Sequence, residues 1–159
     1  MIGGIRINLY NQFMLVILDT SVIIAFLLST GKNFVREIIR QAKDGKIKLI
    51  ASKETISELK KTLTHQSIKK LPNYKPHLIA SFIAWYQYNA VYYSLENKKI
   101  FKELRDINDN IFIQLILVSK SKYLITGDED LLTMKKINLT KIVSTEQFFK
   151  LENIYFDLD

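Results

Sequence analysis

Four acidic residues stand next to apolar segments of the chain, in places where carboxylates could act together. Asp19 directly follows the apolar run 15–18, and Asp128 comes two residues after the apolar part of a later run. Asp109 opens an apolar helical pattern, and Glu58 lies inside another helical pattern. Carboxylates that meet at one place repel one another and raise each other's pKa unless a cation holds them. Hard divalent ions with oxygen ligands, Mg²⁺ or Mn²⁺, are the usual cations, so the acids indicate a candidate metal site.

Asp19 alone also has a purely structural interpretation. Thr20 and Ser21 are good helix-starting residues, and the apolar residues that follow them predict a short buried helix. An Asp before such a helix can simply cap it, and helix-cap preferences support this role about as well as a role in a site. The other acids, in their order along the chain, favour the site.

The apolar pattern predicts the elements that would position these acids. Strands alternating with helices indicate a mostly parallel sheet covered by helices on both faces. In such a sheet ligands bind at the carboxyl ends of the strands, where Asp19 and Asp128 would meet. The segment 90–96 is ambiguous between a strand and a helix end. We expect strands at 15–18, 47–51, 123–126 and 141–143, and helices at 20–28, 33–43, 52–64, 78–89, 110–119 and around 148–149.

Composition limits the class of protein. The 159 residues fit one domain, and 48% of them are apolar, as in a packed globule. The chain has no cysteine, which excludes a disulfide framework, a zinc–thiolate site and a thiol nucleophile, and which suits a reducing cytoplasm. The formal net charge of +7 favours a polyanionic partner, although only weakly, because the lysines are scattered. Asp19 interrupts the one long apolar segment, so we expect no membrane span and no membrane partner.

The amino-terminal residues 1–13 differ from the rest of the chain. They contain Gly3-Gly4 and little periodicity, and Met14 stands directly before the first expected strand. We therefore divide the chain into an extension, 1–13, which is a tail or a start-site artefact, and a domain, 14–159.

Taken in order, four segments of this domain resemble the PIN-domain ribonucleases. Among them, the closest resemblance is to the VapC-like toxins of prokaryotic type II toxin–antitoxin systems. An apolar strand followed by Asp is common, so each segment alone is a weak signal, but four in the right order are fairly specific. The segments are 16–22 with the first acid, 55–59 with the second, 105–110 with the third and 123–132 with the fourth.

The resemblance implies a PIN-like fold, a single three-layer α/β/α domain with a mostly parallel sheet, and a metal-dependent endoribonuclease of the cytoplasm. The acids of such an enzyme hold one or two Mg²⁺ or Mn²⁺ ions, and a bound water attacks the RNA phosphate. It also implies a cognate antitoxin as partner. Carried over to this chain, Asp19 and Asp109 are the principal metal ligands, Glu58 a ligand or water-orienting base, Asp128 a direct or water-mediated ligand, and Thr20 and Thr126 hydroxyls that orient the carboxylates or the phosphate.

Each of the last three acids has a competing neighbour. We favour Asp109 because it directly opens its helix, and we expect the competitor of Glu58 to be solvated. Ile107 replaces the Pro that the family usually has between the two acids of the third segment, so that turn is expected to differ. The competing pairs are Asp109 with Asp106, Asp128 with Asp130, and Glu58 with Glu54.

The sequence also leaves open other functions of the chain and other roles of its aromatic residues and lysines. The alternative function is a catalytically silent PIN-like module that binds RNA or a protein, although such a module has no need of mutually repelling acids. A phosphatase with Asp19 as nucleophile would need an Asp at position 21, which is Ser. The aromatic residues at 82–93 suit a core or a homodimer face better than base stacking. The paired lysines at 60–61, 69–70 and 98–99 are either solvated or follow a phosphate backbone.

Overall fold

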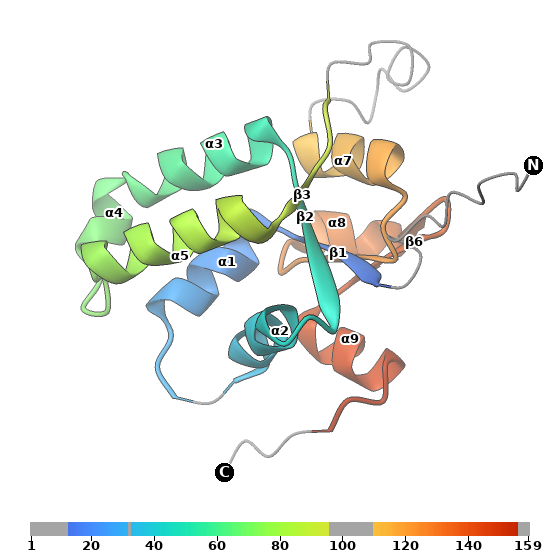
Figure 1. Ribbon diagram of the computed structural model, residues 1–159, viewed down its shortest axis with the longest axis horizontal. Helices are drawn as coiled ribbons and strands as arrows, with labels where there is room; N and C mark the ends of the chain where they lie inside the picture. The colour runs from blue at the N-terminus through green and yellow to red at the C-terminus, as the bar shows by residue number, and fades with distance from the viewer. Residues whose placement is uncertain (1–12, 32, 96–109, 156–159) are drawn as a thin grey trace, which may run out of the picture.

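A six-stranded sheet forms the centre of the molecule (Figure 1). The computed structural model describes residues 13–31, 33–95 and 110–155. Within these residues the strand order is β3-β2-β1-β4-β6-β5, and all neighbouring strands are parallel except β5 and β6. The strands are β1 (Met14–Leu18), β2 (Ile47–Ala51), β3 (Val91–Tyr92), β4 (Tyr123–Ile125), β5 (Lys136–Ile137) and β6 (Thr140–Val143).

Helices cover both faces of this sheet, which gives three α/β/α layers. Successive side chains of a strand point to opposite faces, and the two hydrophobic cores follow this alternation. Val16 and Leu18 pack with α1, α2, α3, α5 and α9, whereas Ile17 packs with α7 and α8. The helices of the described residues are α1 (Thr20–Leu28), α2 (Phe34–Lys43), α3 (Lys53–Leu63), α4 (Gln66–Lys69), α5 (Pro76–Asn89), α7 (Ile111–Ser119), α8 (Glu129–Met134) and α9 (Thr145–Leu151).

The predicted fold class is therefore confirmed, while some smaller elements were not predicted. The short helices α4 and α8 and the antiparallel strand β5 carry too few residues for a period to be visible in the sequence. Helix α5 begins at Pro76 rather than at 78, because a proline fits the first turn of a helix, where no backbone donor is needed. The ambiguous segment after α5 contains the short strand β3, which pairs with β2.

Register brings the ends of β1 and β4 side by side. Leu18 pairs with Ile125, and the backbone N–H of Asp19 donates to the Ile125 carbonyl at 2.9 Å. The carboxyl ends of both strands therefore lie at one edge, as predicted. Helix α3 starts from this same edge, directly after β2.

Two predictions about the chain as a whole have different outcomes. No helix in the described ranges is long and apolar enough to cross a membrane. Of the predicted extension 1–13, only Phe13 is described, and the Lys48 ammonium lies 5.3 Å from its ring centroid. The division at Met14 stays a prediction.

Candidate active site

Asp19 is the centre of the candidate site, and its side chain does not cap α1. It is 8% exposed, and its backbone carbonyl accepts the N–H groups of Val22 and Ile23 at 3.0 and 3.2 Å. The carboxylate makes no capping hydrogen bond to the helix. The structural interpretation of Asp19 as a side-chain cap is therefore wrong.

Two hydroxyls instead hold one oxygen of this carboxylate. Thr126 Oγ1 donates to Asp19 Oδ2 at 2.6 Å, and Ser21 Oγ donates to the same atom at 3.2 Å. Thr126 is 1% exposed, so its hydrogen bond to a carboxylate is made away from water, where such bonds are strong. Among the described residues both hydrogen bonds go to Oδ2, which leaves Oδ1 for another ligand. Ser21 was not predicted as a site residue, although a hydroxyl two residues after the acid was a visible signal.

Glu58 approaches Asp19 from α3. Its half-buried position raises the pKa of its carboxyl, and the negative charge of Asp19 raises it further. The neighbouring Thr20 hydroxyl opposes this shift by stabilising the charged carboxylate of Glu58. Thr20 Oγ1 is buried, and in the described ranges it makes no hydrogen bond of ordinary geometry. The structure thus brings together Asp19, Glu58 and Thr20, as predicted.

A rigid helix start determines where Glu58 lies. Ser52 Oγ accepts the Thr55 N–H at 3.1 Å, and Thr55 Oγ1 accepts the Ser52 N–H at 2.9 Å, which forms a complete capping box. Both residues are buried. Because this box fixes the first turn of α3 at the edge of the sheet, the next turn carries Glu58 toward Asp19.

Glu54, the competitor of Glu58, is only partly solvated. It lies in the first turn of α3, and its side chain is half-buried. Its Oε2 is shielded from solvent and has no hydrogen-bond partner in the part of the chain that is described. The expectation of a solvated side chain is therefore wrong for this oxygen. A carboxylate in the first turn of a helix is stabilised by the helix dipole, which is a structural reason for its place.

The backbone N–H of Asp128, rather than its carboxylate, contacts this cluster. Its N–H donates to Thr126 Oγ1 at 3.0 Å, so one hydroxyl joins Asp19 to the segment after β4. Its own Oδ1 accepts the Asp130 N–H at 2.9 Å and caps α8. Both Asp128 and Asp130 are exposed. The structure therefore brings the Asp128 backbone to the site and uses one carboxylate oxygen elsewhere.

The third predicted acid and its competitor, Asp109 and Asp106, lie outside the described residues. Within the described ranges no group of three or more His, Cys, Asp or Glu side chains is arranged to hold a metal ion. The described donors nevertheless suit a hard divalent ion. They are the carboxylates of Asp19 and Glu58, and the charge of the first raises the pKa of the second.

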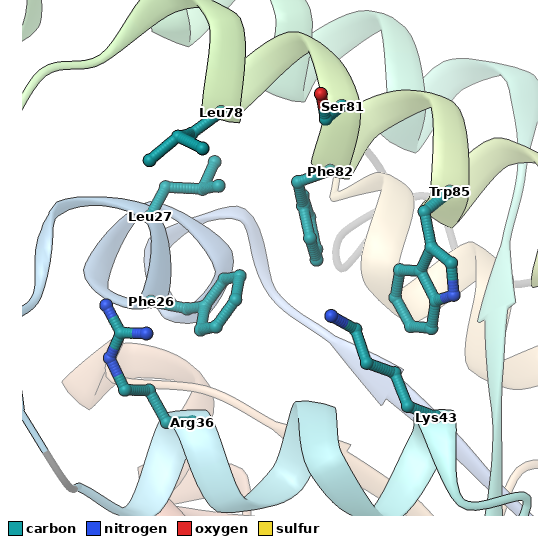
Figure 2. Close-up of a pocket in the computed structure, with 8 residues that line it drawn as sticks. All are labelled: Phe26, Leu27, Arg36, Lys43, Leu78, Ser81, Phe82 and Trp85. Atoms are coloured by element: carbon teal, nitrogen blue, oxygen red, sulfur yellow. The ribbon is translucent and has the colours of Figure 1, made fainter.

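A separate groove lies between α1, α2 and α5 (Figure 2). Its volume is about 340 Å³, and no acidic residue lines it. Two cations lie over aromatic rings there: Arg36 is 5.5 Å from the centroid of Phe26, and Lys43 is 5.4 Å from that of Trp85. The lining residues are Phe26, Leu27, Arg36, Lys43, Leu78, Ser81, Phe82 and Trp85.

Comparison with known proteins gives one match. The family model described as PIN domain matches residues 15–130, a range that contains the candidate site. No curated protein and no solved structure matches the chain. PIN domains are typically nucleases and generally use divalent metal ions, which supports a hydrolase. Because the match spans most of the sequence, the chain belongs to the PIN-domain family.

Proposed function

We propose that the chain is a Mg²⁺- or Mn²⁺-dependent endoribonuclease whose site lies at the carboxyl edge of β1 and β4. One observation carries the proposal: the carboxylate of Asp19 is buried at this edge, is held by two hydroxyls, and faces Glu58 from another element. The charge of Asp19 disfavours the charged form of Glu58, and such an arrangement destabilises the fold unless a ligand compensates. Active sites are where such arrangements are typically found.

The residues that would hold the metal are Asp19, Glu58, Asp109 and Asp128. A bound Mg²⁺ or Mn²⁺ would activate a water molecule and stabilise the charge that develops on the phosphate. Asp19 is suited to a fixed ligand because Thr126 and Ser21 restrain its rotation. Asp128 is suited to a contact through water, since one of its oxygens already caps α8.

Glu58 is suited to accept a proton. Its raised pKa makes its carboxylate a better base than an ordinary exposed glutamate. It lies beside the fixed carboxylate, in position to orient a water against a phosphodiester bound at the same edge. The Thr20 hydroxyl is suited to orient the carboxylate of Glu58, because it lies beside that residue.

The narrower proposal is that this nuclease is the toxin of a toxin–antitoxin pair. The groove between α1, α2 and α5 supports a protein partner, because it is lined by aromatic and aliphatic side chains and Leu78 on its rim is 52% exposed. Arg36 and Lys43 take part in no ion pair in the described ranges, so a partner segment with apolar and acidic side chains complements it. That the chain forms a homodimer stays a prediction.

The nuclease is tested by cleavage of labelled single-stranded RNA with Mg²⁺, Mn²⁺ or EDTA. We expect metal-dependent cutting by the wild type and at least a hundredfold loss in Asp19→Asn, Glu58→Gln and Asp109→Asn. The matched control is Asp44→Asn, an acid before the amino end of β2, which should cut like the wild type. Cutting that survives in all three site variants would contradict the proposed site. Absence of cutting by the wild type, with equal RNA binding by all variants, would favour the silent module.

The partner is tested with the only tryptophan of the chain. Trp85 lies in the groove, so its fluorescence reports directly on what fills it. The probe is a purified small protein encoded by a reading frame next to the gene, where one is found. We expect it to shift the emission of the wild type and to bind Leu78→Glu at least tenfold more weakly. Binding that is unchanged in Leu78→Glu would place the partner elsewhere.

A further inference from the structure

Between Glu58 and Glu96 the sequence contains no acidic residue. This stretch forms the last turns of α3, all of α4 and all of α5. Five lysines lie in its first part, and every one of them is exposed. We call them the lysine surface: Lys60, Lys61, Lys69, Lys70 and Lys75.

Among the described residues, these lysines have no ion-pair partners. The ion pairs of the described residues involve Arg40 and Lys122, which lie outside the stretch. None of the five belongs to an ion pair in the described part of the chain, and residues 59–95 contain no acid. Their charges therefore add to one another, and a surface of unpaired cations attracts a polyanion.

Helix electrostatics explain only part of this surface. Lys60, Lys61 and Lys69 lie in the last turns of α3 and α4, where the helix dipole favours a cation. Lys75, however, is the residue before the first turn of α5, where the dipole disfavours one. Stabilisation of helix ends therefore does not account for Lys75.

The lysine surface begins beside the candidate site and extends away from it. Glu58 precedes Lys61 by three residues in the same helix, a spacing that places both side chains on one face, so the surface begins beside the acids. At its other end, Asn73 Nδ2 donates to the Leu28 carbonyl at 3.1 Å and fixes the loop after α4 to the end of α1. Helix α1 starts directly after Asp19, so this contact lies at the end of α1 away from the acids. In Figure 1, α4 lies at the end of the molecule farthest from the strands, so the surface extends outward from the site.

We infer that the lysine surface binds the sugar–phosphate backbone of single-stranded RNA to one side of the bond that is cut. This inference rests on the proposed function, because it names the path of that same substrate. Lysines on a flexible stem contact phosphates without reading bases, so the surface would add affinity but no sequence preference. RNA long enough to span both the acids and α4 would be bound more tightly than a dinucleotide.

The test measures how tightly the protein binds a labelled 20-nucleotide oligouridylate. Binding is measured by fluorescence anisotropy in the presence of EDTA. The variant changes Lys60, Lys61, Lys69 and Lys70 to Gln. The control changes four exposed lysines of other elements to Gln and so removes the same net charge: Lys120, Lys136, Lys141 and Lys150.

We expect the lysine-surface variant to bind at least tenfold more weakly than the control variant at low salt. Removing one lysine–phosphate interaction lowers the slope of log K against log salt by about 0.7, so removing four lowers it by about 3. Equal binding by the two variants would overturn the inference. So would a stronger response of the wild type to phosphatidylserine vesicles than to RNA, because the surface would then suit a membrane.

EDTA separates this inference from the proposed function. Binding is measured without cleavage, so a protein that fails to cut RNA can still show the difference between the two variants. If the wild type cuts RNA and the two lysine variants bind RNA equally well, the proposed function would stand. The RNA-binding role of the lysine surface would then be rejected. Melting of each variant confirms that both are folded when they are compared.

Discussion

Thr126→Val removes the hydroxyl that joins the two sides of the candidate site while keeping the shape of the side chain. In the wild type this hydroxyl donates to Asp19 Oδ2 at 2.6 Å and accepts the Asp128 N–H at 3.0 Å. Valine can do neither. Asp19 would keep only the longer hydrogen bond from Ser21, and the segment after β4 would lose its connection to β1.

The loss in stability can be worked out from these two bonds. A hydrogen bond to a charged group contributes about 1.5–3 kcal/mol, and a neutral one about 0.5–1.5 kcal/mol. Water can replace the partner of the Asp128 N–H because Asp128 is exposed, so the net cost is about 2 kcal/mol. For a chain of this size that corresponds to a melting temperature lower by about 4–8 °C. A partner that orients a metal ligand also contributes about 10–100-fold in metal affinity or activity, so cleavage should fall by this factor.

Thermal melting and RNA cleavage of two further variants complete this experiment. Thr140 matches Thr126 in burial, at 1% exposed, but its hydroxyl donates to the Ser121 carbonyl near the opposite edge of the sheet. Thr140→Val should therefore lower stability without lowering cleavage per folded molecule. Thr126→Ser restores the hydroxyl and should recover cleavage. If Thr126→Val melts and cuts like the wild type, the hydroxyl does not position Asp19 and the reasoning is refuted.

Three more predictions follow from the same contacts. Burial and Asp19 raise the folded-state pKa of Glu58, so its ionisation destabilises the fold as pH rises through and above the ordinary glutamate range. Glu58→Gln should thus be more stable than the wild type at pH 7, and this gain should vanish in urea titrations at acid pH. Asp19→Asn removes the same repulsion but also weakens the hydrogen bonds that Thr126 and Ser21 donate to a charged oxygen, so it should be less stable than Glu58→Gln at pH 7; a larger gain in Asp19→Asn than in Glu58→Gln would contradict the strength of these bonds. Ser52→Ala should cost about 1 kcal/mol in urea unfolding by breaking the capping box of α3, and an unchanged midpoint would contradict that role.

The sequence predicted the elements whose period is long enough to be visible. The buried strands β1, β2 and β4 and the amphipathic helix α2 lie close to where the apolar pattern indicated them. Helices of four to six residues and the strand β5 were not predicted, and β3 was left open between a strand and a helix end, because one turn or one pair cannot display a period. Their positions depend on contacts with distant segments, such as the pairing of β3 with β2.

The sequence predicted which residues lie at the candidate site better than it predicted the contacts of their side chains. The order of strand ends was enough to place Asp19 beside the segment that contains Thr126 and Asp128. Whether an acid caps its helix depends on side-chain rotation, which the sequence does not determine: Asp128 caps α8, whereas Asp19 does not cap α1. The spacing of Glu54 and Glu58 along α3 did not distinguish which of them meets Asp19, because both lie near its start.

The most direct test of the proposed metal site is Mn²⁺ binding by the metal-free protein, measured by electron paramagnetic resonance. We predict that the wild type and Asp44→Asn bind Mn²⁺ with the same affinity, and that Asp19→Asn and Glu58→Gln each bind at least tenfold more weakly. Equal affinity of all four proteins for Mn²⁺, or no binding by the wild type, would contradict a metal site at the carboxyl edge of β1 and β4.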